Sequence, residues 1–393
     1  MQLKSLCLLL TLCSACAAAE AENNTHLPPF ILDRSQNVFF EDYSVSTFTQ
    51  NLFGVKNSFG SKQVVLGGMA ELDLQRWQGD TINTQDQAGT YTHDTALYFT
   101  QTTFDVMANL TPWVTLFTTA SLSGIGQGGE SGNYLNLPYA FLLFGNIEQC
   151  PLYVYGGYNA ISFGKFNTSG GWDYPLSSTY FQPQVAPGVS LGYQNKKINV
   201  STTVFTDQVL YENHMVYNLL YQNNDHLINY GFGLGYLTHL DLNTTGDVNV
   251  NRNISKENAS MEAGNVADLN GNVGYKDFSL SAEWLRGSEK VLMNHAKPIA
   301  FGTTLTYSPT LNDTYYSAGL SYSKTIYLKD VSTMLAGQDQ IPYASVGLQN
   351  SWAASVTRNF FGDWFYASLN AQRDVTYDNK KTYTFTVDGT AYL

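Results

Sequence analysis

Charged residues and long apolar runs are both scarce in this chain, and the two shortages together bound its class. Charged side chains make up 13% of its 393 residues, about half the share of an average soluble domain. Hydrophobic residues reach 44%, yet after residue 20 no stretch approaches the roughly 18 consecutive apolar residues of a membrane-spanning helix. Apolar residues that are plentiful but never continuous must alternate with polar ones, and alternation predicts β-strands.

Cysteine is scarce as well, and basic residues form no cluster. Three of the 4 cysteines precede residue 20, which leaves Cys150 alone in the rest of the chain. An exported chain without cysteine pairs is typical of a bacterial envelope protein rather than of a eukaryotic secreted glycoprotein. The formal net charge is −12 and no Lys/Arg-rich run occurs, so nucleic acid is not an expected partner.

The N-terminus has the pattern of an export signal. Lys4 is followed by an apolar core over 6–12 and by small residues over 15–21. We expect a signal peptide over 1–19, with cleavage after residue 19 or after residue 21. The segment that follows, 20–63, is polar and irregular, and we expect it to form a short periplasmic extension.

What the chain has in abundance is alternation with a period of two, which begins at residue 64. In 64–77, for example, Leu72 and Leu74 alternate with Glu71 and Asp73. Most such segments are about ten residues or longer, the length that a tilted strand needs to cross a bilayer. A soluble β-sandwich or propeller also alternates, but its strands are usually shorter.

The links between these segments predict the number of strands. Fifteen segments are evident, of which 382–393 is the last. Outer-membrane barrels alternate short periplasmic turns with long extracellular loops, and the short link at 276–277 falls on the wrong side unless 209–221 supplies one more strand. The predicted fold is therefore all-β: a transmembrane antiparallel β-barrel of about 16 strands over 64–393, with 14 or 18 as alternatives and without a plug domain.

Aromatic residues cluster at the ends of the expected strands. Such clusters form girdles at the two interfaces of a bilayer, and they favour a bacterial outer-membrane barrel that contacts lipid and is inserted by the barrel-assembly machinery. The expected girdle residues are Trp77, Trp113, Trp284, Tyr307 and Trp364.

Four acidic residues occupy positions expected to face the lumen: Glu71, Asp73, Asp105 and Glu283. Any water-filled barrel is lined by polar groups, so these residues are first of all candidates for a pore lining. Acidic side chains around a pore also create a field that favours cations.

Two further sets of residues are candidates for contact with a solute. One expected loop, 165–187, is rich in aromatic residues and could fold inward to constrict the pore or bind a ligand; its candidate residues are Lys165, Trp172, Tyr174, Tyr180 and Phe181. Basic residues near strand ends could meet an anionic ligand at the rim, although solvated rims explain them equally well; these are Arg76, Arg252, Arg286 and Arg358.

Patterns of catalytic and metal-binding chemistry are missing. The 6 histidines lack the close spacing of a metal site, and no serine lies in a G-x-S-x-G context. The segment 247–258 begins like a calcium-binding loop, but Arg252 and Asn258 replace the required Gly and Glu. We therefore expect no catalytic residues, no metal and no cofactor, and we expect that the protein is not an enzyme.

One hairpin resembles a known family. The segment "LNLPYAFLLFGNIEQCPLYVYGGYNAISFGKFNTS", 135–169, is similar to the signature hairpin of the LbtU-type siderophore porins, the legiobactin-receptor family. "GGMAELDL" near residue 70 and "GNVGYKDFSLSAEWL", 271–285, are similar to other stretches of that family. The resemblance implies a barrel of about sixteen strands that admits a ferric siderophore without a globular plug. It does not supply binding residues.

The expected function is that of a porin-like channel. A ferric siderophore or similar small solute would enter by TonB-independent facilitated diffusion. The alternatives are a general diffusion porin and, from another class, a surface adhesin or structural barrel. The sequence leaves open the ligand and whether the protein is a monomer or a trimer.

Overall fold

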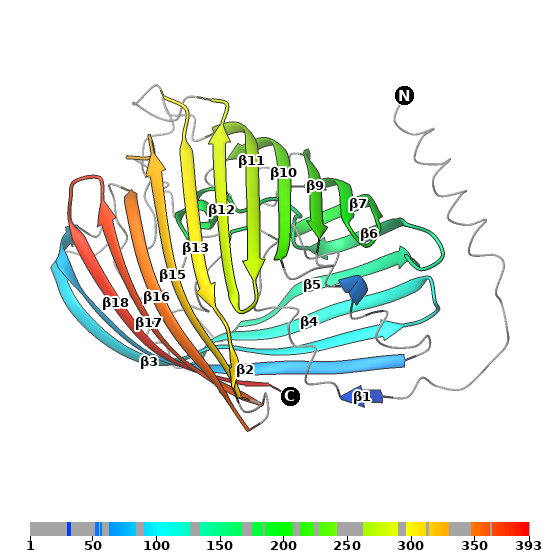
Figure 1. The fold of residues 1–393 in the computed structure, drawn as a ribbon, viewed down its shortest axis with the longest axis horizontal. Helices are drawn as coiled ribbons and strands as arrows, with labels where there is room; N and C mark the ends of the chain where they lie inside the picture. The colour runs from blue at the N-terminus through cyan, green and yellow to red at the C-terminus, as the bar shows by residue number, and fades with distance from the viewer. Residues whose placement is uncertain are drawn as a thin grey trace.

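The computed structural model describes residues 30–32, 52–54, 56, 63–83, 90–125, 134–166, 175–183, 185–206, 213–223, 228–241, 262–289, 296–311, 314–329, 347–361 and 364–392. These residues form a single sheet of 18 strands, of which β1 (Phe30–Leu32) and β14 (Thr310–Leu311) are short additions. The other sixteen close into an antiparallel barrel (Figure 1). The predicted fold class is confirmed.

The barrel strands in chain order are β2 (Gln63–Asn83), β3 (Thr90–Asn109), β4 (Val114–Ile125), β5 (Tyr134–Gly145), β6 (Leu152–Asn159), β7 (Ala186–Gln194), β8 (Ile198–Thr206), β9 (Asn213–Asn223), β10 (Ile228–Asp241), β11 (Glu262–Tyr275), β12 (Phe278–Gly287), β13 (Ile299–Tyr307), β15 (Thr314–Ile326), β16 (Leu348–Phe360), β17 (Phe365–Thr376) and β18 (Lys381–Tyr392). Each pairs with its neighbour in the chain, and β9 is the strand that the link lengths required.

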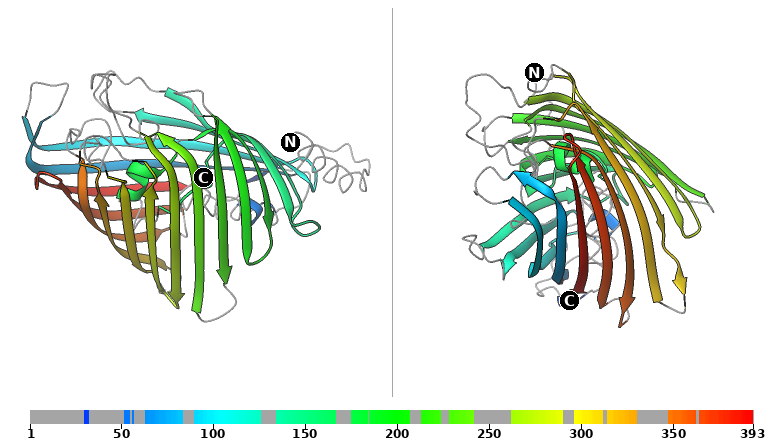
Figure 2. Two further views of the ribbon diagram at one scale, coloured as in Figure 1. Left: turned by 90° about the horizontal axis from the view of Figure 1, so that it is seen from above. Right: turned by 90° about the vertical axis from the view of Figure 1, so that its left-hand side faces the viewer.

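Closure comes from the pairing of β18 with β2. The pairs run from Thr382–Gly79 to Tyr392–Met69, and the right-hand view of Figure 2 shows the red strand beside the blue one. Because the ring is closed, neither strand leaves an unpaired edge along this seam.

Side chains alternate between the two faces of the wall. On β18, Tyr383, Phe385 and Val387 are exposed on the outer face, whereas Thr384 and Thr386 are buried on the inner face. This apolar-out, polar-in arrangement is the reverse of that in a soluble protein, and it is the arrangement that contact with lipid requires.

Short and long connections lie at opposite ends of the barrel. The short ones, such as 110–113, 195–197 and 276–277, define what we call the short-turn end, and connections such as 160–185 define the long-loop end. At the long-loop end β2 continues to Asn83 and β3 begins at Thr90.

The chain leaves the wall after β6 and enters the barrel. This strand ends at Asn159. Gly164 (φ 74°) and Phe166 (φ 47°) adopt left-handed conformations that redirect the backbone, and Gly accepts such a conformation without strain. The segment then forms α3 (Leu176–Phe181), whose six residues are all buried. The left-hand view of Figure 2 shows α3 surrounded by strands.

Among the residues that the structure describes, no helix is long and apolar enough to cross a membrane.

Candidate pore and its constriction

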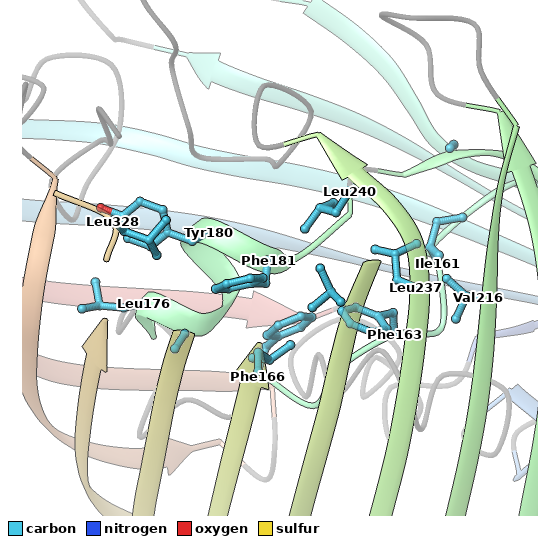
Figure 3. Close-up of a cluster of buried hydrophobic side chains, with 14 of the residues drawn as sticks. Ile161, Phe163, Phe166, Leu176, Tyr180, Phe181, Val216, Leu237, Leu240 and Leu328 are labelled. Carbon is cyan, nitrogen blue, oxygen red and sulfur yellow. The ribbon is translucent and has the colours of Figure 1, made fainter. Parts of the chain in front are cut away.

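The inner space of the barrel holds a hydrophobic cluster that includes described residues between β6 and β7. Of these residues, Phe163, Phe166, Tyr180 and Phe181 are buried. Figure 3 shows them beside Val216 and other side chains of the wall. We call the described residues 160–166 and 175–183 the constriction segment. Three candidates of the expected loop 165–187 are buried inside the barrel, Lys165, Tyr180 and Phe181; that the segment constricts a pore stays a prediction.

Hydrogen bonds fix the constriction segment to the wall of the barrel. The carboxylate of Glu283 on β12 accepts bonds from the backbone N–H groups of Lys165 and Phe166; the Phe166 nitrogen lies 3.1 Å from each carboxylate oxygen. On β15 the Ser323 Oγ accepts a bond of 3.1 Å from the N–H of Leu176. A carboxylate that accepts backbone N–H groups makes strong, charge-assisted bonds, so Glu283 holds the segment in place.

Tyr180 adds a bond to a third strand. The N–H of Leu348, at the start of β16, donates to the Tyr180 hydroxyl at 2.7 Å. The ring of Tyr180 is fully buried in the hydrophobic cluster. The first half of α3 is held from within, because the Ser178 hydroxyl donates to the carbonyl of Pro175 at 2.9 Å.

One of three inward-facing glycine residues on β10, Gly235, leaves room for the segment. Gly231, Gly233 and Gly235 face inward. A Cβ atom on Gly235 would lie 3.2 Å from the ring of Phe163 and 3.1 Å from the Cβ of Asp268. The missing side chain lets the aromatic ring approach the wall.

A second group of side chains enters near the short-turn end. Leu52 and Phe53 are fully buried against inward-facing residues of β4, β5 and β6, and Phe53 meets Tyr153 edge-on with ring centroids 5.3 Å apart. Nearby, Lys56 donates to the carbonyl oxygens of Gly145 and Pro112, the latter at 2.9 Å. Burial lowers the pKa of Lys56 from 10.5 to about 8.

The expectation of a short periplasmic extension over 20–63 did not include this docking. Described parts of 20–63 contact the barrel. In addition to the buried Leu52 and Phe53, β1 pairs in parallel with Val64–Leu66 of β2. The apolar runs Phe30–Leu32 and Leu52–Phe53, in a largely polar segment, were a signal that could have suggested it.

All four acidic residues named as lumen candidates are buried on inward-facing positions: Glu71, Asp73, Asp105 and Glu283. Glu283 belongs to the wall and also accepts hydrogen bonds from the constriction segment. Asp388 lies opposite Asp73 on the neighbouring strand. Carboxylate oxygens of Glu71, Asp73 and Asp388 lie within 4.8 Å of one another.

Three further inward-facing acids were not named from the sequence: Asp268, Asp374 and Asp388. Neutral donors accompany them. The Asn270 amide donates to Asp268 at 2.6 Å, the Gln372 amide donates to Asp374 at 2.9 Å, and the hydroxyl of Thr390 donates to Asp388 at 2.9 Å. Strict alternation along β11, β17 and β18 was the signal that could have identified these acids.

Two of the expected girdle residues lie at outer-face positions of strands: Tyr307 of β13, which is 39% exposed, and Trp284 of β12, which is half-buried. Trp364, 40% exposed, and Trp113, half-buried, lie in turns. The outer face also carries aromatic pairs that the sequence analysis did not include, among them Tyr322 and Trp352, with ring centroids 4.5 Å apart.

Trp77 corrects the expected girdle. Its side chain is 1% exposed and belongs to the hydrophobic cluster inside the barrel. The reason is register: odd-numbered residues of β2, including Glu71 and Asp73, face inward, and Trp77 has the same parity. A tryptophan near a strand end was taken for a lipid-facing residue without regard to its face.

The described basic candidates do not converge on a mouth. Arg76 and Arg286 are exposed on the outer face near the long-loop end. Arg358 lies near the short-turn end, where its guanidinium is 4.7 Å from the ring centroid of Phe360 and 5.4 Å from that of Tyr316. The other candidates, Arg252, Trp172 and Tyr174, lie outside the described residues.

Comparison with known proteins gives a family and a fold. A family model described as "Protein of unknown function (DUF3573)" matches residues 35–266. No curated protein matches the chain.

Solved porin structures share the architecture. The anion-selective porin from Comamonas acidovorans has a TM-score of 0.53 at 9% identity, with 84% of this chain and 99% of that chain covered. OmpT of Vibrio cholerae, described as an outer membrane protein, is similar with a TM-score of 0.52 and 11% identity for its loop L8 deletion mutant, over 84% of this chain and 99% of that chain. At such low identity these likenesses establish the fold alone.

Proposed function

Because the chain belongs to the family described as DUF3573, proteins of unknown function, we propose its function from the barrel itself: it is an outer-membrane channel through which a small solute diffuses. The observation that carries this proposal is the combination of a polar inner wall with an anchored constriction segment. A barrel used only as a membrane anchor does not require a segment held at three places inside it, by Glu283, Ser323 and Tyr180.

We propose further that the chain transports its solute and catalyses no reaction, and that the barrel-assembly machinery inserts it after export by a signal peptide. The outer face supports insertion in a bilayer, since apolar residues such as Leu74, Leu320 and Val356 are exposed there.

A ferric siderophore is the specific solute that we propose, taken up without energy from TonB. The support is the resemblance of 135–169 to the siderophore porins and the absence of a globular plug among the described residues. A general diffusion porin is the second candidate, and the porin fold favours it.

Two measurements separate these possibilities. Purified protein in a planar bilayer should give stepwise conductance; a silent protein that is correctly folded would refute the channel and favour an adhesin or structural barrel. Uptake of a ferric siderophore should fall in a deletion strain and recover when the gene is restored. Unchanged uptake would rule out the siderophore and leave the general porin.

A further inference from the structure

Charged residues are sorted by sign between the two faces of the wall. Among strand residues whose side chains the structure describes, seven of the eight acids are buried on the inner face: Glu71, Asp73, Asp105, Asp268, Glu283, Asp374 and Asp388. The eighth, Asp80 of β2, is exposed on the outer face. The basic residues of the same strands all lie on outer-face positions: Arg76, Arg286, Lys324, Arg358, Arg373 and Lys381. No described strand directs a Lys or Arg inward.

The acids are not spread evenly around the ring. Five of the seven belong to the adjacent strands β17, β18, β2 and β3, which we call the acidic wall; they are Glu71, Asp73, Asp105, Asp374 and Asp388. The other two, Asp268 and Glu283, lie on β11 and β12, where Lys165 and the backbone of the constriction segment face them. α3 contacts β12, β13, β15 and β16, next to the acidic wall.

Such a wall is costly without positive charge nearby. Like charges within 4.8 Å, as in Glu71, Asp73 and Asp388, repel each other, and removal of a carboxylate from water costs several kcal/mol in a real protein. Neutral donors such as Thr390 and Gln372 stabilise single carboxylates, but they do not change the sign of the potential. Mobile cations in the lumen do change it, and low-dielectric walls focus this attraction.

We propose that the channel passes cations in preference to anions, and that Glu71, Asp73 and Asp388 are the main determinants of this selectivity. The inference rests on the proposed channel function. It deepens that function by assigning the solute class: cationic or neutral solutes enter readily, a ferric siderophore among them only if its complex carries no net negative charge, and anionic complexes are disfavoured.

The test is the reversal potential of the full-length protein in a planar bilayer with a KCl gradient. We expect the reversal potential of the wild-type protein to lie on the potassium side of zero. In the variant Glu71→Gln, Asp73→Asn, Asp388→Asn the ratio of potassium to chloride permeability should fall by about threefold or more, as expected for a change of roughly one kT in the local potential.

A matched control removes a carboxylate from the outer face. Asp80→Asn lies on the same strand as Glu71 and Asp73 but is exposed and outward-facing, so its permeability ratio should equal that of wild type. The migration of unboiled and boiled samples on a denaturing gel confirms that each variant is folded.

The possible results distinguish a failure of the proposed cation selectivity from a failure of the proposed channel function. A reversal potential of the wild-type protein at zero or on the chloride side would overturn the proposed selectivity and leave the proposed channel intact. An unchanged ratio in the triple variant would overturn the role of the three residues. A folded protein without conductance would overturn the channel, and the selectivity with it.

Discussion

Lys56 shows how burial of a single residue couples the interior of the barrel to pH. The side chain is 5% exposed, and its ammonium group donates to the carbonyls of Pro112 and Gly145. Because burial lowers its pKa from 10.5 to about 8, the docked segment binds fewer protons than the released segment between these two values. Docking therefore becomes more favourable as the pH rises from 8 toward 10.5, and it is constant below 8.

A spin label next to this residue measures the effect. Gly54 is exposed, and a Cβ atom there would have nothing within 4 Å, so Gly54→Cys, labelled in a Cys150→Ser background, should not disturb the docking of Leu52 and Phe53. We expect the immobile fraction of the nitroxide spectrum to increase between pH 8 and 10.5. In Lys56→Met this increase should disappear. A wild-type spectrum that does not change over this range would contradict the assigned cause.

Trp77 shows where sequence reasoning at the scale of residues reached its limit. Alternation assigned Glu71 and Asp73 to the inner face correctly, and the same count places Trp77 there. The error came from a second rule, that aromatic residues near strand ends face lipid, which overrode the parity. Where the two rules disagree, parity decides, because the pleat of a strand fixes the direction of each side chain.

At the scale of elements, β18 separates a lipid-facing residue from its lumen-facing neighbour. Val387 is 49% exposed and lies between Leu74 of β2 and Leu369 of β17, both also exposed on the outer face. The adjacent Thr386 is buried on the inner face, where it accepts a bond of 3.4 Å from Gln75. A lysine should therefore have opposite consequences at the two positions.

We expect Val387→Lys to destabilise the barrel by about 2 to 4 kcal/mol and to reduce membrane assembly, because a lysine on the lipid face must leave water. Thr386→Lys is the matched control: its ammonium group enters a wall that already carries Asp388, so assembly should stay near the wild-type level. Quantitative immunoblots of isolated outer membranes measure both. Equal assembly of the two variants would show that the faces are misassigned.

The constriction segment was predictable only in part. Its content of aromatic residues and proline in an expected long loop indicated an inward fold, and Tyr180 and Phe181 do lie inside the barrel. The contacts that fix it were not predictable, because Glu283, Ser323 and Leu348 are more than a hundred residues away in the chain. No local sequence pattern indicates contacts between residues that are so far apart in the chain.

At the scale of the whole molecule, the number of strands followed from geometry and the docking of the N-terminal segment did not. Alternation and the parity of the links were enough for sixteen strands, and they identified β9 where the pattern was weak. The burial of Phe53 against Tyr153 depends on a space between β4, β5 and β6. That space exists only after the barrel has closed, so the apolar residues of 20–63 suggest burial but do not identify the place where they dock.

Closure itself can be tested through the register of β18 against β2. Ala391 lies directly opposite Ala70, and both side chains are on the outer face. Opposed residues of an antiparallel pair have Cα atoms about 4.5 to 5.5 Å apart, within the range that a disulfide spans. In a Cys150→Ser background, Ala70→Cys with Ala391→Cys should therefore cross-link on oxidation, and the unreduced, denatured chain should migrate faster.

The control shifts the pair by two residues. Ala391 is diagonal to Leu72, whose direct partner is Gly389, and diagonal pairs lie about 7 to 8 Å apart, so Leu72→Cys with Ala391→Cys should cross-link poorly. Efficient cross-linking of the shifted pair alone would mean that the register is displaced by two residues. If neither pair reacts in folded protein, β18 does not meet β2, the wall is open at this seam, and the edges of both strands must find other partners.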